Sequence, residues 1–334
     1  MIEQFRNYFE NNEQITDNDL EYDDNRIYDY HMYPALNYHD IGEYICEPDK
    51  SKRYFGLELE REISEDNYYV YIRDFDDEYD DINDAIPNFH NYEAYQTLLQ
   101  WLSNHEFHTL KDYVWASKDS SISYGLEFIT HPCTLEYWLN TDTLERICDK
   151  LKSTTDHSEV GLHVHVSKNF TTMQQCLIAL FVTVHKDIFE KFADREENEY
   201  CSHEHLDLIQ SRIRNSKKPT RTFFTLYNIL VVERNNAVNI SRSKPTIEFR
   251  LFKSSKNVDH IKNCLLFCDS ICNYMTRIYK RTSNNACELI DIMQDNKNMD
   301  FKDYLKYLES VPMYSPLHIE LQYLYRFMRG DYEL

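Results

Sequence analysis

Polar residues, mostly glutamate and histidine, alternate with apolar ones in four short segments of the chain, FGLELE, YGLEF, GLHVHVS and IEFRLF. Alternation of apolar and polar residues with period two predicts β-strands whose polar side chains share one face. If the four strands lie in one sheet, that face carries Glu58, Glu60, Glu127, His163, His165, Glu248 and Arg250. Neighbouring strands lie about 5 Å apart, so four carboxylates would repel one another strongly unless cations lie between them. Carboxylates with a neutral imidazole suit Mg²⁺ or Mn²⁺, so the pattern predicts a metal-binding active-site face.

Simpler interpretations exist for each part of this pattern. Glu58 and Glu60 also fit an ordinary solvent-facing strand, and His163 with His165 fits a half-exposed one. Arg250 also fits as a plain counter-charge for the glutamate two residues before it. We favour the functional interpretation because one rule places all these side chains on the same face. An arginine beside metal-bound carboxylates is also suited to binding a phosphoryl group during its transfer.

The glycines support the importance of these strands. The chain has only five, and Gly56, Gly125 and Gly161 each precede a leucine that is followed by a glutamate or histidine. Because glycine lacks a side chain, this placement predicts a close approach of other groups to the backbone at these three positions. No glycine-rich phosphate loop is present, so side chains of the sheet and a metal ion would have to hold any nucleotide.

Composition excludes several classes of protein. With 57 acidic and 36 basic residues, the formal net charge is −21, which argues against nucleic acid or an anionic membrane as the main partner. An odd number of cysteines, nine, without framework spacing indicates a reducing compartment. Without a signal peptide or a run of transmembrane length, we expect a cytoplasmic protein.

One large domain with appendages is the predicted organisation, because no linker or internal repeat divides the chain. Residues 1–52 form an acidic, tyrosine-rich arm, residues 53–285 the catalytic domain, and residues 286–334 a helical appendage with turns at Pro312 and Pro316. The elements predicted by periodicity are a strand over Tyr69–Phe75, helices over Glu93–Asn104, Leu135–Leu151 and Asp259–Tyr279, a hairpin turning at Lys118–Ser121, and a helix capped by Thr171 or Thr172 that runs to about Phe192.

Two cysteine clusters are set aside as metal sites. Cys264, Cys268 and Cys272 recur every four residues, which places them on the buried stripe of a helix as small apolar residues. The closely spaced Cys201, His203 and His205 are interpreted as residues of a loop.

In their order and residue types, the four strands resemble the motifs of the putative amidoligase family, found mostly in phages and bacteria and related to glutamine synthetase and γ-glutamylcysteine ligase. FGLELE is similar to the opening Phe-Gly-x-Glu-x-Glu motif, and KDSSISYGLEFITHP to an Asp-x-Ser motif followed by a Gly-x-Glu segment. VGLHVHVS is similar to the Gly-x-His-x-His-x-Ser strand shared with glutamine synthetase, and TIEFRLF to the closing Glu-x-Arg strand. The resemblance runs from Tyr54 to Lys253.

The resemblance implies an α+β fold in which helices back a curved antiparallel sheet, like the catalytic domain of glutamine synthetase, with ATP and two or three Mg²⁺ (or Mn²⁺) ions bound. His165 and Ser167 would face the nucleotide, and Arg250 the phosphates, with Glu248 and Glu60 also catalytic. The implied metal ligands are Glu58, Glu60, Glu127, His163 and Glu248. The glutamate that completes one metal site of glutamine synthetase has no clear counterpart, so the number of ions stays open. Asp119 matches a family position without an assigned role, and Arg221, Arg234 and Arg242 are candidates for binding substrate.

The activity implied is an ATP-dependent carboxylate–amine ligase that forms an amide or isopeptide bond through an acyl phosphate, in the host cytoplasm if a phage encodes the chain. The acidic composition suggests a cationic amine, such as a peptide, a protein lysine or a polyamine. One alternative is a guanidino or other small-molecule kinase on the same fold, and another is a non-catalytic acidic binding protein. Neither the substrates nor the oligomeric state can be predicted.

Overall fold

The computed structural model describes residues 38–41, 43–45, 48–63, 113–118, 125–151, 154–155, 160–198, 201–203, 235–241, 244–281 and 300–331, with a few positions between 208 and 228. The chain divides into two compact units, residues 1–34 and 35–334, and every described residue belongs to the second. Several predicted features lie outside the described residues: the strand Tyr69–Phe75, the helix Glu93–Asn104, the hairpin turn beyond Lys118, His205, Asp119, Arg234 and Arg242. The predicted arm and appendage boundaries stay predictions.

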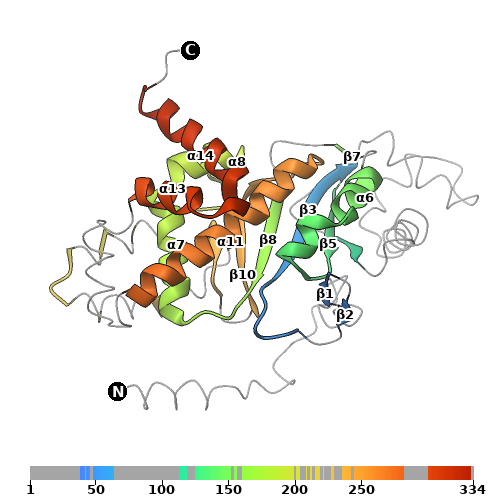
Figure 1. The fold of residues 1–334 in the computed structure, drawn as a ribbon, viewed down its shortest axis with the longest axis horizontal. Helices are drawn as coiled ribbons and strands as arrows, with labels where there is room; N and C mark the ends of the chain where they lie inside the picture. Colours follow the sequence, from blue (N-terminus) through green and yellow to red (C-terminus); the bar gives the residue numbers. More distant parts are fainter. Residues whose placement is uncertain are drawn as a thin grey trace, which may run out of the picture. The chain divides into compact units, whose positions relative to one another are not determined.

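An open, mixed β-sheet organises the second unit (Figure 1). Its main path is β2-β1-β6-β3-β8-β10-β9, while β5 and β7 also pair with β3, and β4 pairs with β5. The bounds are β1 Tyr38–Asp40, β2 Glu43–Ile45, β3 Tyr54–Ile63, β4 Val114–Lys118, β5 Gly125–Thr130, β6 Cys133–Thr134, β7 Thr154–Thr155, β8 Gly161–Ser167, β9 Val238–Asn239 and β10 Thr246–Lys253. The four predicted strands are therefore β3, β5, β8 and β10, and the pairing of β4 with β5 confirms the predicted hairpin strands.

The sheet departs from a purely antiparallel one at a single described pair. β1 runs parallel to β6 through His39 and Cys133, whereas every pairing of β3, β8 and β10 is antiparallel. The α+β class is confirmed, and the sheet is mixed where the resemblance implied an antiparallel one. Likeness to the catalytic domain of glutamine synthetase stays a prediction.

One face of the sheet is apolar and covered by helices, as the alternation predicts. Leu57, Leu59, Val164 and Phe249 have no exposed surface. The long helix α11 (Val258–Arg281) packs against β8 and confirms the predicted helix, while α8 packs against β10. The indole Nε1 of Trp138 donates to the backbone oxygen of Phe55 at 2.9 Å, which joins the helical layer directly to β3.

Two predicted helices are each divided in two. The segment 135–151 forms α5 (Leu135–Asn140) and α6 (Thr143–Lys150), because Thr141 takes an extended conformation and its hydroxyl donates to the backbone oxygen of Tyr137 at 2.9 Å. Thr171 caps the next helix with a reciprocal capping box, but α7 (Thr172–Val184) ends at His185 and α8 (Lys186–Ala193) follows. Uninterrupted helices were therefore the wrong prediction at both places.

The C-terminal segment is helical and packs on the same core. It contains α13 (Phe301–Glu309), the 3₁₀ turn η5 (Pro312–Tyr314) and α14 (Ser315–Met328). Pro316 lies in the first turn of α14 rather than at a separate turn. Amide hydrogens of the first turn have no partner within the helix, so proline costs no hydrogen bond there. The buried stripe of α11 includes Cys264, Cys268 and Cys272, all without exposed surface, which confirms their interpretation as apolar packing residues.

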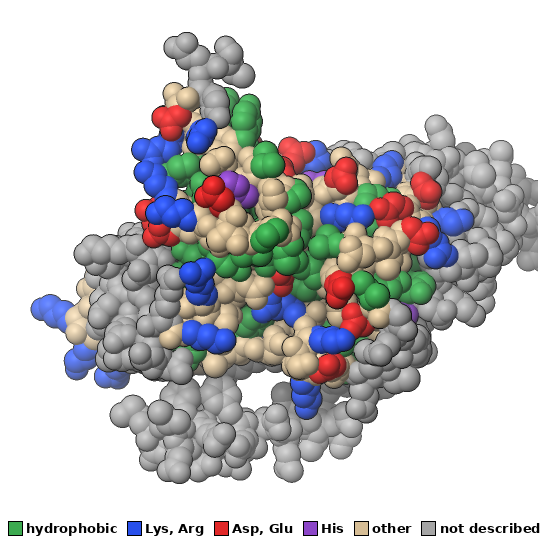
Figure 2. All heavy atoms as spheres, viewed as in Figure 1, with side chains coloured by type: hydrophobic (Ala, Val, Ile, Leu, Met, Phe, Trp, Pro, Cys, Tyr) green, Lys and Arg blue, Asp and Glu red, His purple; other side chains and the backbone are tan. Residues whose placement is uncertain are grey.

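Charge is mixed on the helical side of the described structure. Figure 2 shows acidic and basic side chains interspersed there, with hydrophobic side chains between them. Among the described helices, none combines the length and the apolar composition needed to cross a lipid bilayer.

Candidate metal centre on the sheet

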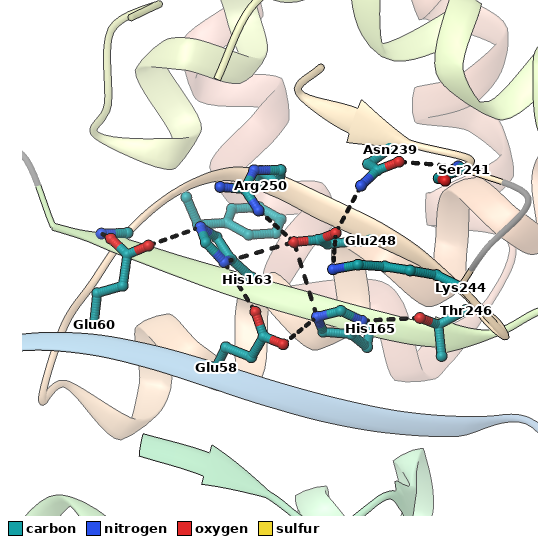
Figure 3. Close-up of polar contacts among 12 residues, drawn as sticks. Glu58, Glu60, His163, His165, Asn239, Ser241, Lys244, Thr246, Glu248 and Arg250 are labelled. Atoms are coloured by element: carbon teal, nitrogen blue, oxygen red, sulfur yellow. Dashed lines mark hydrogen bonds and ion pairs between the residues drawn. The ribbon is translucent and has the colours of Figure 1, made fainter. Parts of the chain in front are cut away.

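The strand register brings the predicted polar residues together on the other face of the sheet (Figure 3). Glu58 of β3 lies directly opposite His163 of β8, and His165 lies opposite Glu248 of β10. On the far side of β3, Glu60 lies opposite Glu127 of β5. Directly opposed side chains of a sheet point to the same face, so the four strands share this polar face as predicted.

Imidazole rings lie between the carboxylates. His163 Nδ1 is 3.1 Å from Oε2 of Glu58, and its Nε2 is 3.2 Å from Oε1 of Glu60. His165 Nε2 is 2.9 Å from Oε1 of Glu58, while its Nδ1 lies 2.9 Å from the hydroxyl of Thr246. Glu58, Glu60 and His163 are all buried. Burial makes the cluster a strongly coupled set of charges that water screens little.

Glu248 lies at the centre of a second set of contacts. It has no exposed surface, and its Oε1 accepts from Nη1 of Arg250 at 2.5 Å. Its Oε2 accepts from Nδ2 of Asn239 at 2.9 Å and from Nζ of Lys244 at 2.8 Å. Asn239, Lys244 and Thr246 were not predicted as site residues. Lys244 and Thr246 stand four and two residues before Glu248. They precede the predicted strand, which begins at Ile247, so the alternation of apolar and polar residues did not point to them.

The electrostatics of the cluster follow from these contacts. Burial opposes ionisation of Glu58, but the imidazoles of His165 and His163 outweigh it and hold the pKa of that carboxyl well below its usual range. Burial also opposes ionisation of Glu248, yet His165, His163 and Arg250 lower its pKa to about 2 despite the nearby Glu58. For His165, burial is again the largest effect, but the carboxylates of Glu58 and Glu248 overcome it and raise the pKa of the ring.

Two groups of side chains have the composition of a site for a divalent cation. Glu58, Glu127 and His163 form one, and Glu58, His165 and Glu248 the other, with the ligand atoms of each within 4.8 Å of one another. These are the only such groups of three or more among the described residues. The Nε2 atoms of His163 and His165 are buried and make no well-aligned hydrogen bond there. Oxygen ligands with an imidazole fit Mg²⁺ or Mn²⁺, so the cluster suits such an ion.

A buried arginine supports the floor of the site. Nη1 of Arg195 donates to the backbone oxygens of Arg250 at 3.0 Å and Phe252 at 3.4 Å, at the bulge of β10 between Phe249 and Phe252. A side chain at Gly161 would collide with this guanidinium and would lie 3.1 Å from Oε2 of Glu60. Close approach is therefore confirmed at Gly161, and Arg195 is a supporting residue that the sequence did not single out.

The other glycines give a different result. A Cβ atom at Gly56 would have its nearest neighbours at 3.8 Å, an ordinary contact, so the prediction of close approach was wrong there. Gly161 alone of the three is shown to need the absence of a side chain. The surroundings of Gly125 lie outside the described residues.

Ser167 lies on the same face of β8 as His165, and it is paired with Thr246 of β10. The hydroxyl of Ser167 accepts from the backbone nitrogen of Tyr54 at 3.1 Å, so it links β8 to the start of β3. Arg221 is exposed. Cys201 and His203 are buried, and neither belongs to a metal-ligand group of the described structure.

Comparison with known proteins adds one match. Residues 51–272, well over half of the chain, match the model of a family described as putative amidoligase enzyme. This span contains all four strands of the polar face and every residue of the cluster in Figure 3. The comparison with curated proteins gave no match.

Proposed function

The chain belongs to the putative amidoligase family, a family of ligase-type enzymes, and from this premise we propose that it is an ATP-dependent carboxylate–amine ligase. ATP would transfer its γ-phosphoryl group to a carboxylate, and an amine would then displace phosphate from the acyl phosphate to form an amide or isopeptide bond. The observation that carries this proposal is the polar face itself, where buried carboxylates, two imidazoles and Arg250 meet within hydrogen-bonding distance.

A cation held by Glu58, Glu127 and His163 would supply charge neutralisation for the phosphates of ATP. The protein's own contribution is to hold these ligands before substrates arrive. Glu60 helps by orientation: its Oε1 lies 3.2 Å from Nε2 of His163, and its Oε2 accepts from the backbone nitrogen of Gly161 at 2.5 Å. His163 is therefore contacted by Glu58 at Nδ1 and by Glu60 at Nε2, so its ring loses little conformational freedom when the ion binds.

Arg250 is the candidate for contact with the transferring phosphoryl group. Its Nη1 donates to Glu248, and the Coulombic influence of Glu248, Glu58 and Glu60 raises its pKa in spite of burial, so it stays charged. In the first step, a carboxylate oxygen of the substrate bonds to the γ-phosphorus while the bond to the bridging oxygen breaks and ADP leaves. Negative charge spreads over the equatorial oxygens, which a planar guanidinium can contact with two donors.

In the second step, the amine nitrogen attacks the acyl carbon, phosphate leaves and the amine gives up a proton. His165 and Ser167 are proposed to face the nucleotide. The net charge of −21 supports a cationic amine, such as a lysine side chain, a peptide amine or a polyamine, as the second substrate.

The test is a trap for the acyl phosphate. Purified protein, ATP, Mg²⁺ and a panel of carboxylates are incubated with hydroxylamine, which converts an acyl phosphate into a hydroxamate. We expect ADP and hydroxamate in equal amounts with at least one carboxylate. ADP without hydroxamate, together with a stable phosphorylated product, would favour a kinase. Metal and ATP binding without any turnover would favour a binding protein.

A further inference from the structure

Lys244 contacts Glu248, a member of the second group of candidate metal ligands. Its ammonium group is 2.8 Å from Oε2 of Glu248, and its side chain is only 22% exposed. Oε2 also accepts from Asn239, so both directions in which this oxygen can accept a hydrogen bond are taken. The other oxygen of Glu248 is bonded to Arg250.

The charges around Glu248 are already balanced without a metal. Two basic side chains, Lys244 and Arg250, contact a single carboxylate that has no exposed surface. A divalent ion at this carboxylate would approach both cations at short range, where repulsion between like charges is strong. By contrast, Glu58 contacts the imidazoles of His163 and His165 in the described structure, and an imidazole nitrogen is a common metal ligand.

The backbone carrying Lys244 is itself anchored. The ammonium group of Lys168 donates to the backbone oxygens of Ile240 at 3.2 Å, Ser241 at 2.5 Å and Lys244 at 3.4 Å. The backbone nitrogen of Lys168 donates to the oxygen of Pro245 at 3.1 Å. A segment held by this many bonds on both sides of Lys244 directs its side chain toward the start of β10 rather than leaving it free on the surface.

We propose that Lys244 replaces a second metal ion at Glu248, so that the centre binds a single divalent cation through Glu58, Glu127 and His163. The inference rests on the proposed function and differs from the two or three ions that the resemblance implied. It assigns Glu248 a different role from the predicted one. Glu248 holds Lys244 and Arg250 as a pair of fixed cations beside the metal, where both can face the phosphate groups of the nucleotide.

The test counts bound ions and needs no turnover. The protein is titrated with Mn²⁺, and binding is measured by calorimetry and by electron paramagnetic resonance of the free ion. The wild type should bind one ion per chain. Lys244→Met keeps an unbranched side chain, one atom shorter, and removes its charge, so it should open a second site. Lys253→Met is the control for the loss of a lysine charge, because Lys253 ends β10 and pairs with the exposed Asp194, and it should leave the count at one.

A charge-preserving variant covers the case in which Lys244→Met fails to fold. Lys244→Arg should still bind one ion, and thermal unfolding identifies which variants are folded. Two ions in the wild type, two in Lys244→Arg, or one in a folded Lys244→Met would overturn the role of Lys244 and leave the ligase proposal intact. No Mn²⁺ bound by any variant would overturn the metal centre, and with it both proposals.

Discussion

His163 and His165 each contact two or more carboxylates, so the two imidazole rings separate the glutamates of the site. The carboxylates of Glu58 and Glu248 raise the pKa of His165, so its protonated ring offsets part of their charge in the metal-free protein. The repulsion among carboxylates expected from the sequence is therefore relieved in the structure by the imidazoles themselves. Metal and protons should compete for the same cluster.

The stability of the metal-free protein should reflect this competition. Because the pKa of His165 is raised, its contribution is complete below its unfolded value of about 6.5 and is lost as pH rises through the folded value. Because the pKa values of Glu58 and Glu248 are lowered, their contribution is complete above about 4.5 and is lost as pH falls. Urea unfolding in EDTA should show maximal stability between about pH 4.5 and 6.5.

Glu58→Gln should flatten the alkaline side of that profile, because it removes the nearest negative charge from His165. Mn²⁺ affinity of the wild type should have the opposite trend and rise with pH over the same range, since a cation bound at Glu58 is repelled by the protonated ring of His165. A metal-free stability that stays constant from about pH 6 to 8 would show that folding leaves the proton affinity of His165 unchanged and would contradict this account.

Arg250→Lys tests the phosphate contact. Lysine keeps the charge but loses the planar, two-pronged arrangement of donors. Turnover in the hydroxamate assay should fall about 10²- to 10³-fold, the usual cost of removing a charge-stabilising donor, while ATP affinity changes far less. Arg277→Lys, at an exposed position on α11, is the control and should leave both unchanged. Equal losses in affinity and turnover would mean that Arg250 only binds the ground state.

At the scale of elements, the strands could be predicted from the sequence because a single alternation of apolar and polar residues runs through each of them. Period two located β3, β5, β8 and β10 and their shared polar face, because register in a half-buried sheet is set by the same alternation. It could not locate Asn239 or Lys244, which reach Glu248 from β9 and from the segment before β10. Helix breaks at Thr141 and His185 were missed because hydrophobic periodicity continues across them, while local backbone conformation decides where a helix ends.

The bulge of β10 offers a test of how Arg195 supports the site. Gly161→Ala should displace the Arg195 guanidinium from the backbone oxygens that it holds, because the new methyl group would occupy its place. We expect a loss of about 1–3 kcal/mol in the free energy of unfolding, the usual cost of overpacking. Gly56→Ala is the control, since its Cβ would meet only ordinary contacts. Equal effects of the two changes would contradict a specific role for Gly161.

For the whole molecule, the C-terminal helices share the core that backs the sheet. Leu317 has no exposed surface, and α14 contacts both α8 and α11. Leu317→Ala should cost about 2–5 kcal/mol of stability by creating a cavity, whereas Met313→Ala, at a residue 45% exposed, should cost little. Mn²⁺ affinity measured well below the melting temperature should be unchanged in both. Two separate unfolding transitions would show that the C-terminal helices form an independent unit.

Transfer of oxygen from the carboxylate to phosphate tests the central claim most directly. A carboxylate that gives hydroxamate is labelled with oxygen-18 and incubated with ATP, Mg²⁺ and the amine that supports turnover. If the carboxylate attacks the γ-phosphorus, its oxygen bridges to phosphate in the acyl phosphate and leaves with it when the amine displaces phosphate. Mass spectrometry should then find one labelled oxygen in each inorganic phosphate released with product. Unlabelled phosphate accompanying amide formation would contradict an acyl phosphate and the function proposed for this site.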